Sequence, residues 1–153
     1  MLHLPDGLEV VGAEWFNSAK IEKLIVPSCM KVLGDRAFSE CRCLREVIFE
    51  PGSKLERIEA CCFDRCNLTK IVLPESVQYI GEFCFSDCLN LREVVIPRSV
   101  RKIDGFTFSR CRQLSSLVFE EGSQLTHIGH YAFDGTQLTP EQRRYPNSVR
   151  ESH

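Results

Sequence analysis

The segment LREVVIPRSVRKIDGFTFSRC, residues 91–111, contains every feature that decides the fold of this chain. It opens with a run rich in β-branched residues that Pro97 closes, which predicts a β-strand because β-branched side chains favour strands and proline ends them. A turn follows, and then Ile103, Phe108 and Cys111 stand at fixed offsets. The same arrangement recurs along the chain, so the segment is one unit of a repeat protein.

Phenylalanine marks the repeat most clearly. It recurs at spacings of 22, 25, 22, 23 and 25 residues, at Phe16, Phe38, Phe63, Phe85, Phe108 and Phe133. An apolar residue precedes each of these by five positions, at Val11, Leu33, Ile58, Ile80, Ile103 and Ile128. A cysteine follows by three positions in consecutive repeats, at Cys41, Cys66, Cys88 and Cys111. The chain therefore holds about six repeats of about 23 residues.

The repeats use two forms of the turn after the strand. The shorter form is Pro-x-Ser-Val-x-x-Ile, at residues 74–80 and 97–103. The longer form is Glu-x-Gly-Ser-x-Leu-x-x-Ile, at residues 50–58 and 120–128, and it accounts for the 25-residue spacings. A surface turn can lengthen at little thermodynamic cost, whereas the register of a strand cannot shift.

This pattern predicts a right-handed repeat solenoid of the leucine-rich-repeat kind, either α/β or all β. We expect one short strand per repeat in a single parallel sheet on the concave face, with turns or short helical segments on the convex side. The solenoid should span residues 1–139, with an incomplete first repeat. Residues 139–144, TPEQRR, replace the next strand with polar residues, so 140–153 is expected to be a polar C-terminal tail.

The anchor residues carry a family resemblance. Leu91, Val94, Ile96, Pro97, Ser99, Val100, Ile103, Phe108 and Cys111 are similar to the consensus of BspA-like leucine-rich repeats, and the match recurs over roughly residues 2–138. The resemblance implies a parallel-strand solenoid used for adhesion and for contact between proteins, often on the surfaces of microbes. It implies no catalytic residues.

Composition narrows the class of partner and leaves the compartment open. The chain has 19 basic and 21 acidic residues spread along its length, so no field favours nucleic acid. No apolar run reaches the roughly 18 residues that would insert into a membrane, and the start resembles no signal peptide. Nine cysteines, an odd number, fit reduced thiols and a cytoplasmic location. The family resemblance instead implies the cell surface or secretion, if the chain is a piece of an exported protein.

The chemistry-bearing residues predict no enzyme, no cofactor and no metal site. Four cysteines share one repeat position and should stack as a buried ladder, and no Cys-x-x-Cys pair suits zinc. None of the four histidines, His3, His127, His130 and His153, belongs to a constellation with a nucleophile and a carboxylate. No glycine-rich loop suited to a phosphate is present. Cys43, beside Arg42 and Arg45, is the strongest candidate for a reactive thiol.

The outward positions of the strands form the candidate binding surface. In the pattern Leu-x-x-Val-x-Ile the first, fourth and sixth positions are apolar in every repeat and should point inward, so the second, third and fifth face out. The fifth positions would stack into an apolar stripe of roughly 20 Å, flanked by charges. The partner-binding residues predicted on this face are Ile25, Arg45, Ile48, Lys70, Val72, Arg92, Glu93, Val95 and Val118.

Two interpretations of the stripe remain open. It can be a binding site, or it can reflect only the preference of strands for β-branched residues. On the first interpretation the chain is a non-enzymatic module that binds a protein partner through the concave sheet. The alternative is a structural or adhesive segment of a larger microbial surface protein, with a glycan or matrix ligand. The N-terminal edge strand also allows end-to-end self-association.

Overall fold

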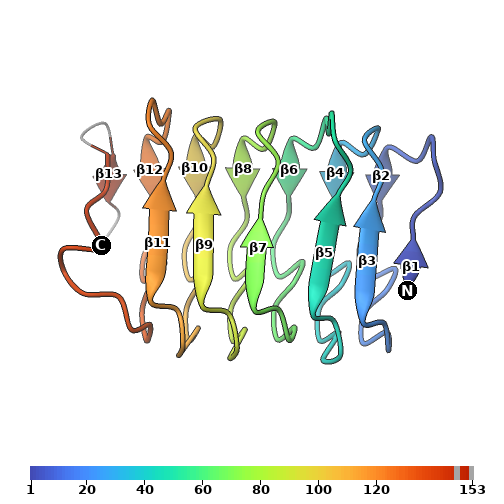
Figure 1. Cartoon of the computed structure of the whole chain (residues 1–153), viewed down its shortest axis with the longest axis horizontal. Coiled ribbons are helices and arrows are strands. Elements are labelled where there is room, and N and C mark those ends of the chain that lie inside the picture. The colour runs from blue at the N-terminus through green and yellow to red at the C-terminus, as the bar shows by residue number, and fades with distance from the viewer. Residues whose placement is uncertain (147–148, 152–153) are drawn as a thin grey trace.

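The computed structural model describes residues 1–146 and 149–151. The chain winds into stacked coils, with the N-terminus at one end of the stack and the C-terminal strand at the other (Figure 1). The described residues form no helix, and so none that could cross a membrane. The predicted parallel-strand solenoid is confirmed, in its all-β form.

Each coil places its longer strand on one side of the stack, which we call the front face (Figure 1). Its strands are β1 (Leu2–His3), β3 (Lys23–Val26), β5 (Glu46–Phe49), β7 (Lys70–Val72), β9 (Glu93–Ile96) and β11 (Ser116–Phe119). They are parallel and pair in a register that aligns equivalent repeat positions, for example Val94 with Leu117. This is the sheet that the sequence predicted as the concave face.

The front face is not one continuous sheet, which corrects the expectation of a single sheet. It consists of two three-stranded sheets, β1-β3-β5 and β7-β9-β11, because no ladder joins β5 to β7. The chain entering β7 is one residue short: Cys66 precedes Leu68 by two positions, whereas Cys41 precedes Leu44 by three. The first backbone hydrogen bond between neighbouring coils, just before each front strand, is therefore made by a different residue at this junction.

Where the connection has its full length, the residue after the leucine that opens the strand pattern makes this first hydrogen bond. After Leu91, for example, Arg92 N–H donates to the Thr69 carbonyl at 2.9 Å. At the β5–β7 junction the residue before the anchor makes it, since Asn67 N–H donates to the Leu44 carbonyl at 2.9 Å. Gln137 N–H repeats this early bond to Leu114, after which no further front strand is described. A connection shortened in the same way before Ile21 leaves β3 paired with the two-residue strand β1.

A second ladder of two-residue strands runs along the back of the stack (Figure 1). The seven strands are β2 (Val10–Val11), β4 (Val32–Leu33), β6 (Arg57–Ile58), β8 (Tyr79–Ile80), β10 (Lys102–Ile103), β12 (His127–Ile128) and β13 (Arg150–Glu151). The sequence predicted one strand per repeat and missed these, because two residues give no alternating pattern to recognise.

The remaining side of each coil is a turn whose backbone bonds reach the next coil. Phe38 N–H donates to the Cys62 carbonyl, and Glu40 N–H donates to the Asp64 carbonyl, both at 2.9 Å. Residues two before and two after the phenylalanine adopt left-handed φ values, such as 54° at Arg36 and 57° at Glu40. This backbone alternation turns every second N–H group toward the neighbouring coil, while the N–H groups between them, such as that of Ala37, donate within the same turn. The turns are therefore held together without strands.

The predicted core columns are observed. The six repeat phenylalanines stack face to face, with ring centroids 5.3 to 5.6 Å apart and interplanar angles of 4° to 8°. The cysteine ladder lies beside them, and each thiol donates to a phenylalanine carbonyl of the preceding coil; the Cys88 Sγ lies 3.2 Å from the Phe63 oxygen. Stacking therefore closes a core that no single coil could form.

Residues beyond 139 contact the last coils. Tyr145 packs at 6.0 Å from both Phe119 and Phe133, and Arg143 donates to the Phe133 carbonyl at 3.0 Å. The backbone of β13 pairs with β12. The division into a solenoid at 1–139 and a tail at 140–153 stays a prediction, but the described part of that tail lies against the solenoid.

Candidate functional site

The fifth-position column lies on the front face as predicted. The register aligns His3 with Ile25 and Ile48 on one sheet, and Val72 with Val95 and Val118 on the other. Val72 is 57% exposed, Val118 is 48% exposed and His3 is also exposed, while Ile25, Ile48 and Val95 are half-buried. The column is thus two apolar segments separated at the β5–β7 junction.

The charged residues beside the column are on the surface. Lys70 lies 3.9 Å from Glu93, with both side chains about half exposed, and Arg92 donates to the Gln113 amide oxygen at 3.2 Å. Arg45 is exposed. Exposed ion pairs stabilise a fold by only about 0 to 1 kcal/mol, so this fringe remains available to a partner at little loss to the fold.

The junction of the two front sheets is hollow. An open pocket of about 590 Å³ lies between β5 and β7, where Figure 1 shows the two strands set apart. Its lining consists of Arg45, Glu46, Val47, Ile48, Phe49, Thr69, Lys70 and Val72. Four predicted site residues therefore meet here, namely Arg45, Ile48, Lys70 and Val72.

A second pocket of about 470 Å³ continues this one past the ends of the two strands. The two pockets share Phe49 and Val72, and the second is further lined by Glu50, Pro51, Gly52, Ser53, Leu73, Pro74, Glu75 and Ser76. We refer to the two together as the β5–β7 groove. The sequence analysis missed it, and the shortened connection before Leu68 was not a sufficient signal, because the same shortening before Ile21 leaves β3 paired with β1.

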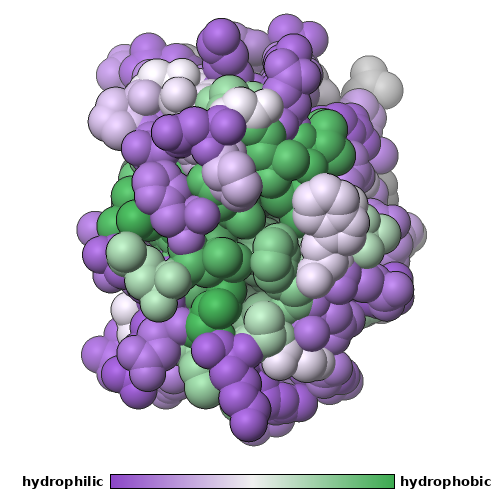
Figure 2. Space-filling model, turned by 90° about the vertical axis from the view of Figure 1, so that its right-hand side faces the viewer, coloured by the Kyte–Doolittle hydropathy of each residue, from purple (hydrophilic) through white to green (hydrophobic). Residues whose placement is uncertain are grey.

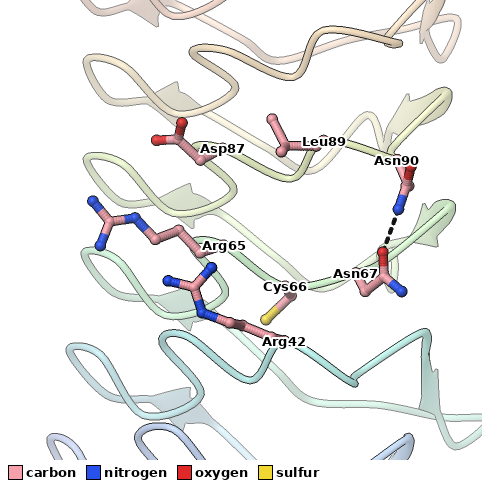
Figure 3. Close-up of a pocket in the computed structure, with 7 residues that line it drawn as sticks. All are labelled: Arg42, Arg65, Cys66, Asn67, Asp87, Leu89 and Asn90. Atoms are coloured by element: carbon pink, nitrogen blue, oxygen red, sulfur yellow. Dashed lines mark hydrogen bonds between the residues drawn. The ribbon is translucent and has the colours of Figure 1, made fainter.

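A third pocket, of about 260 Å³, lies on the turn side of the stack (Figure 3). Arg42 and Arg65 line it, but both also bond the same Glu40 oxygen, at 3.2 and 3.1 Å. The amides of Asn67 and Asn90 bond each other. The polar groups of this pocket are thus largely engaged by the chain itself.

The cysteines are suited to packing and not to chemistry. Burial raises the pKa of the Cys41 thiol from 9.0 to about 11. Burial also raises the pKa of Cys62, Cys66, Cys84 and Cys88 well above the ordinary value. Since the thiolate is the nucleophile and the metal ligand, these groups stay inert at neutral pH. Cys43 is exposed and free, so it remains the candidate reactive thiol.

One trio of possible metal ligands is found among the described residues. His3, Asp6 and Glu50 offer ligand atoms within 4.8 Å of one another at the N-terminal end of the front face. His3 and Glu50 already lie 3.5 Å apart as a surface pair. Exposed groups of this kind are common without an ion, and we assign the trio no metal.

Comparison with known proteins agrees with the fold. The family model described as "BspA type Leucine rich repeat region (6 copies)" matches residues 1–56 and 49–151. The predicted resemblance is therefore confirmed. A search of curated proteins found no match.

Solved structures of bacterial leucine-rich repeat proteins are similar over nearly the whole chain. A leucine-rich cell surface protein from Faecalibacterium prausnitzii is 28% identical with a TM-score of 0.83, and the match covers 95% of this chain and 38% of that protein. A leucine-rich repeat protein from T. pallidum is 26% identical with a TM-score of 0.69, covering 94% and 79%. A leucine-rich repeat protein from Eubacterium ventriosum, 23% identical with a TM-score of 0.76 and covering 91% and 36%, shows the fold alone.

Proposed function

Because this chain belongs to the family of BspA type leucine-rich repeat proteins, we propose that it is a non-enzymatic module that binds a protein partner through its front face. The repeat fold is consistent with an interaction or adhesion module. The proposed contact residues are those of the apolar column and its charged fringe: Ile25, Arg45, Ile48, Lys70, Val72, Arg92, Glu93, Val95 and Val118.

The observation that carries this proposal is the exposure of aligned apolar side chains. Val72 and Val118 each leave about half of their surface to solvent, and Val95 lies between them in register. Apolar side chains clustered on a surface and rimmed by charges are typical of binding sites. The fringe of Lys70, Arg92 and Glu93 supplies such a rim.

A capture experiment tests the proposal. The chain is immobilised and exposed to extract of its source cells, beside a variant carrying Ile48→Glu, Val72→Glu and Val95→Glu. A partner retained by the parent and lost by the variant supports the front face. A control with Val10→Glu and Val32→Glu adds two negative charges to the back ladder, one fewer than the front-face variant carries. Loss in this control but not in the front-face variant would refute the assignment, provided that circular dichroism shows all three folded.

A second candidate function is an adhesive segment of a larger surface protein, with a glycan or matrix ligand. The match to a cell surface protein that is far longer than this chain favours it. On this account antibodies against the chain should label intact source cells, and the chain should bind glycan arrays or immobilised matrix protein. Labelling only after the cells are permeabilised would instead favour a cytoplasmic module.

The N-terminal end supports a further proposed contact, self-association. β1 and β2 each pair on one side only, and Figure 2 shows an apolar patch on the end of the stack where they lie. Val10 is 50% exposed and Trp15 is 57% exposed there. Sedimentation over a range of concentrations should show association that Val10→Lys weakens. A parent that remains monomeric at all concentrations would eliminate this contact.

A further inference from the structure

We propose that the β5–β7 groove binds an extended segment of the partner. This segment carries one apolar residue and one basic residue, separated by two to three positions in either order. The inference rests on the proposed function, since the groove lies in the front face. It adds the chemistry of the bound segment and the place where that segment lies.

The backbone of the groove is prepared for an extended chain. Among the strands that the structure describes, β5 pairs only with β3, and β7 pairs only with β9. In a parallel ladder, successive backbone groups of one strand point alternately to its two sides, so half of those on β5 and β7 face the groove. No ladder satisfies these facing groups. Free strand edges are the feature that extended peptides recognise through main-chain hydrogen bonds. Some Cα atoms of β5 and β7 lie within 8 Å of each other, closer than the roughly 9.5 Å that a strand between them needs, so the bound segment lies over the groove and pairs with one edge at most.

The middle of the groove is apolar. Ile48 and Phe49 line it from β5, and Val72 lines it from β7. Val72 is 57% exposed, whereas Val95 occupies the same repeat position between two paired strands and is half-buried. The difference comes from the break beside β7. An apolar side chain of the partner would cover Val72, which removes apolar surface from water.

The charges at the two ends of the groove differ. Glu50 and Glu75 line the end beyond the strands, beside Pro51 and Pro74, with Glu50 also 3.5 Å from His3. This end carries two carboxylates and so favours a basic side chain.

At the other end, Arg45, Glu46 and Lys70 are of mixed sign, and Lys70 also lies 3.9 Å from Glu93. That end therefore sets no strong preference. Glu50 follows Ile48 by two residues, and Glu75 follows Val72 by three. An extended peptide rises by about 3.3 Å per residue, as the strands do, so its basic side chain should lie two to three residues from its apolar one.

A synthetic peptide tests the chemistry directly. The probe is acetyl-Ser-Val-Thr-Val-Ser-Lys-amide, titrated into the isotope-labelled chain while amide resonances are followed by NMR. We expect shifts confined to residues 46–50 and 70–75. Replacing the peptide lysine by glutamate, or both groove carboxylates by Glu50→Gln and Glu75→Gln, should weaken binding about three- to tenfold. The control variant Glu120→Gln and Glu121→Gln, at the turn after β11, should bind as the parent does.

Shifts spread over the whole front face, or equal affinity for the lysine and glutamate peptides, would overturn the proposal. A pair of tryptophan variants distinguishes failure of the groove proposal from failure of the proposed front-face function. Val72→Trp fills the groove, whereas Val95→Trp adds the same bulk one strand away, at an intact junction. The inference predicts loss of the peptide in the first and retention in the second. Loss of a captured partner only in Val95→Trp would keep the front-face function and reject the groove.

Discussion

At the scale of single residues, the repeat phenylalanine contributes most to the fold. Phe85 is fully buried, with Phe63 stacked on one face at 5.6 Å and Phe108 on the other at 5.3 Å. Burying such a side chain contributes roughly 1.5 to 3 kcal/mol relative to leaving it exposed, and removing it also leaves a cavity. The phenylalanines at the two ends of the column differ in burial, since Phe16 is half-buried and Phe133 is buried.

Phe85→Ala should lower the free energy of unfolding by about 3 to 5 kcal/mol. Phe16→Ala should lower it by less, because Phe16 is only half-buried and stacks on Phe38 alone. Phe133 is not an open end, since Tyr145 covers its outer side. Urea melts of the two variants give the comparison, and equal losses would contradict the role assigned to the stack.

The buried thiols predict a dependence of stability on pH. Burial holds the pKa of Cys41 at about 11 when folded, against 9.0 for an ordinary thiol. A group whose pKa is higher in the folded than in the unfolded state contributes its full stabilisation at pH values below the unfolded-state pKa. This contribution is lost as the pH rises through the folded-state pKa. Urea melts in reductant should therefore show a free energy of unfolding that falls between about pH 9 and pH 11. Cys41→Ala should decline less steeply, and an identical decline would exclude this cause.

At the scale of elements, the sequence predicted the longer strands well and the shorter ones not at all. Runs such as that ending in Ile96 combine β-branched residues with a closing proline, and β9 (Glu93–Ile96) is found there. The two-residue strands, such as β10 (Lys102–Ile103), exist only because neighbouring coils supply their hydrogen bonds. Such pairing is a property of the stack and leaves no local pattern.

The candidate site was predictable in part for the same reason. Inward and outward positions follow from alternation, so the exposure of Val72 and Val118 could be inferred. The groove depends on whether β5 and β7 pair, and this is decided by hydrogen bonds between coils. Side-chain pattern alone treats every junction of the sheet as equivalent.

Restoring the missing residue of the connection tests this account of the break. One serine inserted after Asn67 gives the repeat the spacing found between Cys41 and Leu44. We expect β5 and β7 to pair, so that amide hydrogens of residues 70–73 exchange more slowly with deuterium. The insertion should also abolish binding of the lysine peptide. Unchanged exchange in a folded variant would show that the short connection does not cause the break.

At the scale of the whole molecule, the two ends of the stack are unlike. The N-terminal end presents an apolar patch (Figure 2), whereas Tyr145 packs over Phe119 and Phe133 at the other end. Uncovered end coils lose the contacts that interior coils make on both sides. The C-terminal residues thus act as a cap on the last coil.

Removing the cap should destabilise the stack from that end. Tyr145→Ala is expected to lower the free energy of unfolding by about 1 to 2 kcal/mol, since it loses aromatic contacts with two rings. Tyr131→Ala is the matched control, because this ring is 64% exposed and also contacts two rings, those of Phe106 and His130, which lie outside the column of repeat phenylalanines. Thermal melts compare the two, and equal shifts would argue against a cap.

The central claim is that the front face binds the partner, and site-specific photo-crosslinking tests it most directly. A photoreactive phenylalanine replaces Val72 in one variant and Val10, on the back ladder, in another; the two native side chains are 57% and 50% exposed. Irradiation in the source cell should attach the partner to the Val72 variant, whereas the Val10 variant, which lies in the proposed self-association contact, should attach only further copies of the chain. Attachment of the same partner only through position 10 would place binding on the back of the stack and contradict the account.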